Sequence, residues 1–215
     1  MKKFIVLFSL FILPLVFYIF LSKGIYKYAN LPILTEKVLD ITSVDSRQNV
    51  SLLNHLTVVG FLGADIKSAK ASLFNLNQII YKRYYQKPYF QIVLILPEGT
   101  QGAYKNVIAE LEEFTNIEKY KFVYLNNNDI NMVFNSFNSP FTLNSSLYSE
   151  NTFIIDRELR LRGRKDDDDA VNGELYGYNM NSVAVLKNKM KDDIDIIYYQ
   201  LKKSAEKKAR NKRKI

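Results

Sequence analysis

The middle of this chain alternates short apolar runs with longer amphipathic segments. Three runs have the length and the β-branched or aromatic content of buried strands: Leu56–Leu62, Gln91–Leu96 and Lys121–Leu125. After the first and second runs, apolar residues recur at helical spacing over Ile66–Tyr85 and Ala103–Phe114. The two apolar stripes comprise Ala69, Leu73, Leu76, Ile80 and Tyr84, and then Val107, Ile108, Leu111 and Phe114. Such alternation predicts parallel strands joined by helices, which is an α/β fold.

The pattern changes after the third run. A short helix, capped by Asp129, is expected to reach Phe137. Thr152–Asp156 and Leu159–Arg164 then form a predicted hairpin across the turn Arg157-Glu158. A final helix begins at Ser182, with an apolar face of Val185, Leu186, Met190, Ile194, Ile197, Tyr198 and Leu201. Parallel strands followed by an antiparallel hairpin and a last helix predict a thioredoxin-like central mixed sheet flanked by helices.

The region before the first run reads as a small hairpin. Val38–Thr42 and Val50–Leu53 are short alternating pieces, and polar residues at 45–49 supply turn chemistry between them. Asp65, directly after the first run, is the predicted N-cap of the following helix.

Near its N-terminus the chain carries 18 uncharged residues, Phe4–Leu21, interrupted by Pro14. A membrane helix needs about 20 apolar residues, whereas the apolar part of a cleaved signal peptide has about 7–15. The length favours a retained anchor, and a cleaved signal is the alternative. Two lysines precede the segment, Lys2 and Lys3, and the α-amino group adds a third charge, so the cytoplasmic side is predicted for the N-terminus.

This arrangement predicts a single-pass protein of the inner cell membrane that contacts lipid through residues 4–21. The rest of the chain is expected in the periplasm or another extracytoplasmic space. The predicted segments are a cytoplasmic N-terminus (1–3), a signal-anchor helix (4–21), a linker (22–34), a thioredoxin-like domain (35–203) and a basic tail (204–215).

Positive charge is concentrated at the C-terminus. From Lys202 to Lys214 there are eight basic residues and one acid, so about +7 of the net charge of +8 lies there. The body is nearly neutral, and no nucleic-acid partner is expected for it. The tail is either a solvated helix end or a contact for anionic lipid or a partner. The contact residues would be Lys207, Lys208, Arg210, Lys212, Arg213 and Lys214.

The chain contains no cysteine. Disulfides, thiolate metal ligands and thiol nucleophiles are therefore excluded. No glycine-rich phosphate loop or Ser/His/Asp arrangement is present either, so we expect no catalytic residues, no cofactor and no enzyme activity.

Several pieces of the sequence resemble the SCO/SenC family of membrane-anchored copper-delivery proteins, and thioredoxin-like proteins more broadly. They are Leu31-Pro32, a strand ending at Val58–Phe61, and the stretch FIIDRELRLRG at Phe153–Gly163. The similarity extends from about Leu31 to Lys203 and implies a thioredoxin-like fold. These motifs are more specific for fold than for function.

The resemblance also implies a copper site that this chain lacks. The two cysteines of the family would fall at Ile66 and Lys70, or at Asp65 and Ala69 after a one-residue shift. The family histidine would fall within 144–150, where this chain has none. Soft copper(I) prefers sulfur ligands with imidazole, so a degenerate member without this site is expected.

Three other features of the sequence could carry chemistry or contacts. His55 is the sole histidine and has no evident catalytic partner, so a surface or strand-edge role is expected. Asp166, Asp167, Asp168 and Asp169 are candidate metal ligands, although a block of like charges usually forms a solvated loop. Five aromatic residues could either bind a partner or pack a helix end against the sheet: Tyr81, Tyr84, Tyr85, Tyr89 and Phe90.

The sequence therefore predicts a non-catalytic, membrane-anchored binding or assembly module for an envelope or respiratory complex, with an unidentified protein partner. One alternative is a carboxylate-based metal chaperone or enzyme that uses Asp65 or residues 166–169. Another is a cytoplasm-facing protein whose tail binds lipid or nucleic acid.

Overall fold

A computed structural model describes residues 2–24 and 30–212, and the side chains of residues 8–19, 30–170 and 172–204. The first helix, α1 (Lys2–Gly24), includes the predicted anchor, whose outer side chains at 4–7, 20 and 21 lie outside the described residues. Among the residues that the structure describes, no helix is both long enough and apolar enough to cross a membrane. The membrane anchor therefore stays a prediction.

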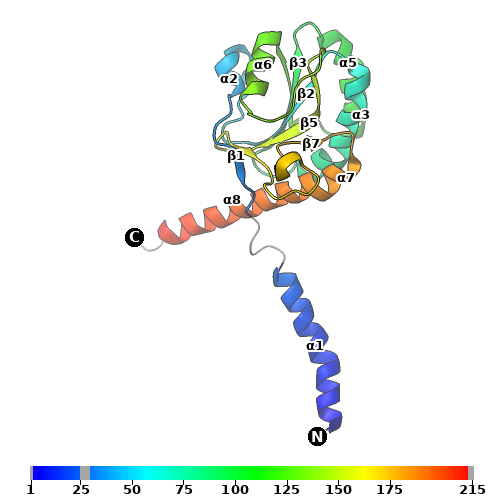
Figure 1. Cartoon of the computed structure of the whole chain (residues 1–215), viewed down its shortest axis with the longest axis vertical. Coiled ribbons are helices and arrows are strands. Elements are labelled where there is room, and N and C mark those ends of the chain that lie inside the picture. Colours follow the sequence, from blue (N-terminus) through cyan, green and yellow to red (C-terminus); the bar gives the residue numbers. More distant parts are fainter. Residues whose placement is uncertain (1, 25–29, 213–215) are drawn as a thin grey trace. The chain divides into compact units, whose positions relative to one another are not determined.

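Residues Leu31–Tyr198 form one compact unit, and the N-terminal and C-terminal segments form another. The compact unit is built on a mixed sheet with the strand order β1-β6-β5-β2-β3-β4, and β7 pairs with β5 (Figure 1). β2, β3 and β4 are parallel, while β5 is antiparallel to β2, β6 and β7. The strands are β1 (Ile33–Thr35), β2 (Leu56–Leu62), β3 (Phe90–Pro97), β4 (Tyr120–Leu125), β5 (Tyr148–Ile155), β6 (Leu161–Arg162) and β7 (Tyr178–Asn179).

Helices cover both faces of this sheet. On one face lie α2 (Ile41–Val44) and α6 (Asn127–Asn135), and on the other α3 (Ile66–Leu76) and α5 (Gln101–Phe114) (Figure 1). The chain continues from α3 through a π-helical segment, η2 (Asn77–Tyr81), into α4 (Lys82–Tyr84). The shorter helical turns and the C-terminal helices are η1 (Ser46–Gln48), η3 (Val171–Gly173), α7 (Val183–Val185), the π-helical η4 (Leu186–Met190) and α8 (Lys191–Lys212).

The core beneath α2 and α6 is aromatic. The Phe61 ring of β2 meets Phe134 and Phe137 edge-to-face, with centroids 5.0 and 5.8 Å apart, and Phe153 of β5 joins them. Such ring pairs add directional attraction to the burial of apolar area. On the opposite face, the predicted stripe Ala69, Leu73, Leu76, Ile80 and Tyr84 is fully buried.

The structure confirms the mixed sheet flanked by helices and the thioredoxin-like plan, in which β2-α3-β3 is followed by the antiparallel β5-β6 pair and α8. β2 has the predicted bounds, and the N-caps Asp65 and Ser182 accept bonds from the nitrogens of Lys67 and Val185. The polar turn at 45–49 is present, but as a short helical turn rather than a hairpin connection.

Three local predictions are wrong. No hairpin forms within 33–56, because Val38–Thr42 runs into α2 instead of pairing as a strand. The Asp40 carboxylate accepts hydrogen bonds from the Ser51 hydroxyl and the Leu52 nitrogen, which holds the two segments together without a strand pair. The cap of α6 is Asn126, whose side chain accepts from the nitrogen of Asp129. Phe114 is 57% exposed rather than inward, since α5 ends there, and its ring packs edge-to-face with Phe74.

Candidate functional site

Two loops meet at the place where the resembled family would carry its thiols and imidazole. The loop after β2 hydrogen-bonds to the loop before β5, because the Ala64 nitrogen donates to the Ser146 carbonyl at 2.8 Å. Gly63 has a φ of +61°, and a Cβ there would lie 2.4 Å from the same carbonyl oxygen. Only glycine fits this close approach. The fold thus places Gly63 and Ala64, which lead into Asp65 and Ile66, against residues 146–148 of the 144–150 segment.

The residues on the β2 side of this junction have structural tasks. Asp65 accepts bonds from the Lys67 nitrogen and the Ser68 hydroxyl, and these bonds hold the pKa of the Asp65 carboxyl below its ordinary value. One turn later, Lys70 is exposed and its ammonium lies 2.6 Å from Glu110. A carboxylate occupied in capping its own helix is not positioned as a nucleophile or a metal ligand.

The β5 side of the junction is also held by its own hydrogen bonds. The Asn144 side-chain oxygen accepts from the nitrogens of Ser146 and Tyr148 and from the Ser146 hydroxyl. The Tyr148 hydroxyl lies 2.7 Å from Ser72 Oγ on α3, and Ser72 also bonds to Asn181. Tyr148 therefore ties β5 to α3, in the segment where the family histidine would fall.

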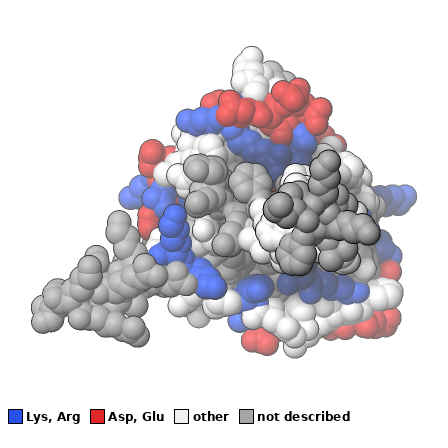
Figure 2. Space-filling view, turned by 90° about the horizontal axis from the view of Figure 1, so that it is seen from below, with Lys and Arg blue, Asp and Glu red and all other residues white. Residues whose placement is uncertain are grey.

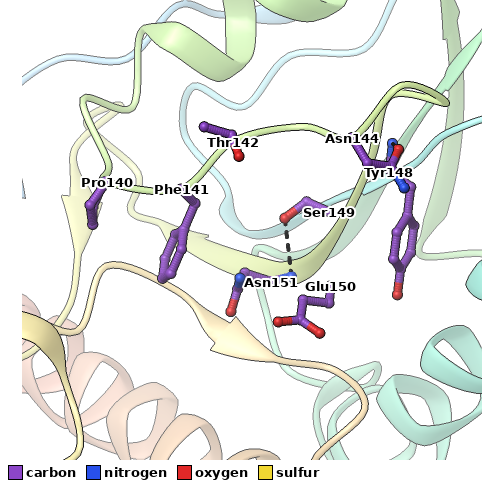
Figure 3. Close-up of a pocket in the computed structure, with 8 residues that line it drawn as sticks. All are labelled: Pro140, Phe141, Thr142, Asn144, Tyr148, Ser149, Glu150 and Asn151. Atoms are coloured by element: carbon purple, nitrogen blue, oxygen red, sulfur yellow. Dashed lines mark hydrogen bonds between the residues drawn. The ribbon is translucent and has the colours of Figure 1, made fainter.

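An open cleft lies beside this junction, with a volume of about 460 Å³ (Figure 3). We call it the β5 cleft. Figure 3 shows Phe141 near one end and Tyr148 at the other, with Glu150 and Asn151 between them. Its lining residues are Pro140, Phe141, Thr142, Asn144, Tyr148, Ser149, Glu150 and Asn151. Aromatic rings with amide and carboxylate groups can bind a partner, but this lining contains no nucleophile–base pair.

The acidic block is only partly the solvated loop that was expected. Asp166, Asp168 and Asp169 are exposed, but Asp167 is 5% exposed and its carboxylate lies 2.5 Å from Lys189 Nζ and 3.6 Å from Arg164. Lys189 also reaches Asp169 at 2.8 Å. Within the described residues, no group of three or more His, Asp or Glu side chains is arranged to hold a metal ion.

This pairing changes the acid–base behaviour of the loop. Burial lowers the pKa of Lys189, but its hydrogen bonds to Asp167 and Asp169 outweigh burial and raise that pKa. The same ammonium lowers the pKa of Asp169. Lys189 therefore stays charged, and it neutralises carboxylates that a cation would otherwise need.

A buried carboxylate that the sequence analysis missed extends this network. Asp193 of α8 is 1% exposed, and it accepts bonds from Arg164 at 2.8 Å and from the Tyr178 hydroxyl at 2.7 Å. Burial raises the pKa of Asp193 despite these two donors. The one available signal was Asp193 itself, which falls between the inward positions Met190 and Ile194 of the predicted helix.

His55 and the aromatic cluster have mainly structural surroundings. His55 is half-buried, and its Nδ1 lies 3.0 Å from the Leu53 carbonyl oxygen. Tyr81, Tyr84 and Phe90 are buried, so the packing interpretation of the cluster is confirmed for them. The Tyr84 hydroxyl donates to Asp195 of α8, which fixes α4 to the last helix. Tyr89 is exposed beneath the Arg157 guanidinium, 3.9 Å from its ring centroid.

The basic tail adds little that the structure can describe. The side chains of Lys207, Lys208, Arg210, Lys212, Arg213 and Lys214 lie outside the described residues. In Figure 2, the visible face of the described residues carries acidic patches beside the lysine and arginine patches. This mixed face lacks the single-sign surface that sequence-independent binding to phosphates requires.

No protein-family model and no curated protein sequence matches this chain. Three similar solved structures illustrate what the search of structures found. A putative electron transfer protein from Aquifex aeolicus VF5 is 14% identical, with 78% of this chain and 97% of that chain covered and a TM-score of 0.46. The thioredoxin domain of a thiol-disulfide oxidoreductase from Bacteroides vulgatus is 16% identical, with 77% and 98% covered and a TM-score of 0.41.

Copper-bound ScoI from Bradyrhizobium japonicum is 11% identical, with 77% of this chain and 99% of that chain covered and a TM-score of 0.40. These neighbours are thioredoxin-like, SCO-like and thiol-disulfide oxidoreductase-like proteins, whereas this chain has no cysteine. At such low identity, function does not follow from likeness of fold.

Proposed function

We propose that this chain is a non-catalytic binding or assembly module with a thioredoxin-like scaffold. One observation carries the proposal. The loops at Gly63–Asp65 and 144–148 meet as they would around a thiol site, yet their polar groups bond to each other and to their own backbones. A scaffold without a thiolate cannot exchange disulfides, but it retains the cleft beside the junction.

The β5 cleft is the proposed contact for a protein partner. It is open, and it combines the ring of Phe141 with the exposed polar side chains of Thr142, Asn144 and Glu150. Aromatic anchors surrounded by hydrogen-bonding groups are typical of protein interfaces. Its rigid side is β5, which is paired with β2 and β7.

We further propose that residues 4–21 anchor the chain in the inner membrane, with the domain on the extracytoplasmic side and an envelope or respiratory complex as its setting. The support is the uncharged run in the sequence and the preceding lysines. Among the side chains described in α1, Phe11 and Phe17 are exposed to the surroundings of the helix. Exposed apolar side chains of this size favour a lipid environment.

Site-specific photocrosslinking of the full-length chain tests the partner proposal. A benzophenone amino acid would replace Thr142, which lines the cleft, or Glu112, which is exposed on α5 as a control. We expect a discrete crosslinked protein from position 142 and none from position 112. Equal crosslinking at both positions, or none at position 142 in native membranes, contradicts the proposal.

Membrane extraction tests the anchor. The full-length chain should stay in the membrane pellet after carbonate washing, and a chain without residues 4–21 should not. A reporter enzyme that is active only outside the cytoplasm, fused after Ile215, should be active. An active cytoplasmic reporter at the same position would favour the alternative in which the basic tail contacts lipid or nucleic acid inside the cell.

The described geometry gives no support to the carboxylate-based metal alternative. Asp65 caps α3, and Asp167 and Asp169 are paired with Lys189. Calorimetric titration of the purified full-length chain with Ca²⁺, Zn²⁺ and Cu²⁺ should detect no binding at micromolar concentrations. A stoichiometric isotherm that disappears with Asp167→Asn would favour the metal-binding alternative instead.

A further inference from the structure

A second, smaller cavity lies next to the β5 cleft, with a volume of about 240 Å³. The two hollows share Pro140, Phe141 and Asn151. The cavity extends from Phe141 to η4 and lies under the acidic loop, which we define as residues 165–174. This loop is closed at its base, where the backbones of Arg164 and Leu175 exchange two hydrogen bonds. The cavity therefore has walls from three separate parts of the chain.

The floor of the cavity is apolar. Phe141, Leu175 and Val185 contribute to its lining, and the Phe141 ring packs edge-to-face on Phe153 of the core. Gly177 leaves room for this pair, because a Cβ there would lie 3.0 Å from the Phe153 ring and 3.2 Å from the Phe141 ring. The floor is thus fixed to the core of the sheet rather than formed by mobile surface side chains.

The rim of the cavity is acidic. The Asp169 side chain is 82% exposed and Glu174 is half-buried, while Glu150 is exposed in the adjoining cleft. The one cation in the lining, Lys189, is already paired with Asp167 and Asp169. The acidic loop carries five carboxylates, from Asp166 to Asp169 and Glu174, against the three cations Arg164, Lys165 and Lys189. The carboxylates are in excess, so an approaching positive charge is attracted to the rim.

We propose that this cavity takes one apolar side chain of an extended protein segment whose neighbouring residues are Lys or Arg. The proposal rests on the proposed function and names the chemistry of its partner. At about 240 Å³ the cavity is smaller than sites for whole cofactors or drug-sized ligands, and it suits a single anchor side chain. The carboxylate rim selects basic residues beside that anchor through complementary charge.

Binding of labelled peptides to the full-length chain in detergent micelles tests the assignment by fluorescence anisotropy. The probe is the fluorescein-labelled peptide GSKKFKKSG. Two comparison peptides replace its anchor, GSKKSKKSG, or reverse its charge, GSEEFEESG. We expect the probe to bind at least about tenfold more tightly than either comparison peptide, because burial of one aromatic side chain and charge complementarity each contribute that much.

Variants of the chain locate the site. Ala170→Phe places a ring in the cavity and should weaken probe binding by about tenfold or more. The pair Asp169→Asn with Glu174→Gln removes two rim charges and should weaken binding and reduce its dependence on salt. Glu112→Gln with Glu113→Gln, on the exposed face of α5, is the charge-matched control and should bind as the wild type does.

Equal binding of the three peptides overturns the assignment, and so does wild-type binding by the rim variant. If Ala170→Phe does not fold, the rim variant decides, because Asp169 is exposed and glutamine at position 174 still offers an oxygen to the Tyr176 hydroxyl. The photocrosslinking result at Thr142 separates this assignment from the proposed function. If the crosslinked partner persists in the Ala170→Phe and rim variants, the proposed function is retained and only the assignment of this cavity is contradicted.

Discussion

Arg162 of β6 and Asp156, at the end of β5, form an ion pair inside the compact unit, with Nη1 2.9 Å from Oδ2 and the side chains 8% and 6% exposed. The same guanidinium donates to the carbonyl oxygens of Leu31 and Pro32. Arg162 therefore joins the β5-β6 hairpin to the first residues of the unit. The FIIDRELRLRG motif of the sequence thus contains a structural pair rather than a chemical site.

Replacing Arg162 with leucine should be strongly destabilising. The substitution leaves the buried Asp156 carboxylate with one arginine partner fewer, and it removes a donor from two carbonyl oxygens. Loss of one partner of a buried ion pair costs about 3–5 kcal/mol of folding free energy. Arg160→Leu is the control, because Arg160 is more exposed and should cost about 1 kcal/mol or less. Urea denaturation of both variants measures the difference, and equal losses would falsify the assigned role of Arg162.

The acid stability of the protein should depend on Asp156. Burial raises the pKa of Asp156, but the hydrogen bonds from Arg160 and Arg162 outweigh burial and hold that pKa below its ordinary value. The unfolded chain then takes up this proton at higher pH than the folded chain. The stabilisation is complete above the unfolded pKa of about 4 and is lost as the pH falls through the lower folded pKa.

The measurement is the free energy of unfolding of wild type and Asp156→Asn at pH 7, 5 and 3. The variant should be less stable at pH 7 and 5 by a constant amount, because the unfolded carboxyl is still mostly ionised at pH 5. The difference should shrink towards pH 3. A gap that is unchanged at pH 3 would show that the ionisation of Asp156 contributes nothing to folding.

Gly63 should tolerate no side chain. Its φ of +61° and the approach of the Ser146 carbonyl oxygen combine backbone strain with a steric clash, so Gly63→Ala should cost about 2–5 kcal/mol. Gly99 is the matched control: its φ is +88°, but a Cβ there has no neighbour within 4 Å. Gly99→Ala should therefore cost only the strain of about 1–2 kcal/mol. Thermal melts measure the loss of Tm in each variant. Equal losses of Tm would mean that the contact between the two loops does not contribute to stability.

The long elements of the fold were predictable because their signal is local. β2 is an uncharged apolar run, β3 and β4 are apolar apart from Gln91 and Lys121 near their starts, and the stripe of α3 continues unbroken through η2 to Tyr84. β1 and β7 have three and two residues, and they exist only because partners far along the chain pair with them: Arg162 with Ile33, and Thr152 with Tyr178. No periodicity can be read in so few residues.

The charged network was not predictable for a related reason. Asp167 and Lys189 are 22 residues apart, and the sequence shows only four adjacent acids that would ordinarily be solvated. Their pairing depends on the position of η4 against the loop, which follows from the burial of Leu186 and Met190. The sequence shows that cysteine is absent at Ile66 and histidine is absent within 144–150, where the resembled family has its ligands. It does not show the hydrogen bonds that hold these loops instead.

The pairing of Asp167 with Lys189 should keep the acidic loop closed over the small cavity. Asp167→Ala removes the bonds to Lys189 and to the Asp169 nitrogen, although the backbone bond from residue 167 to Gly173 remains. The free energy of local opening of the loop should then fall by about 1–2 kcal/mol. Backbone amides at 165–174 should therefore exchange with solvent about 5- to 30-fold faster. Hydrogen-exchange mass spectrometry measures this, with the exposed Asp168→Ala as the control. Equal exchange in the two variants would mean that the backbone bonds alone hold the loop.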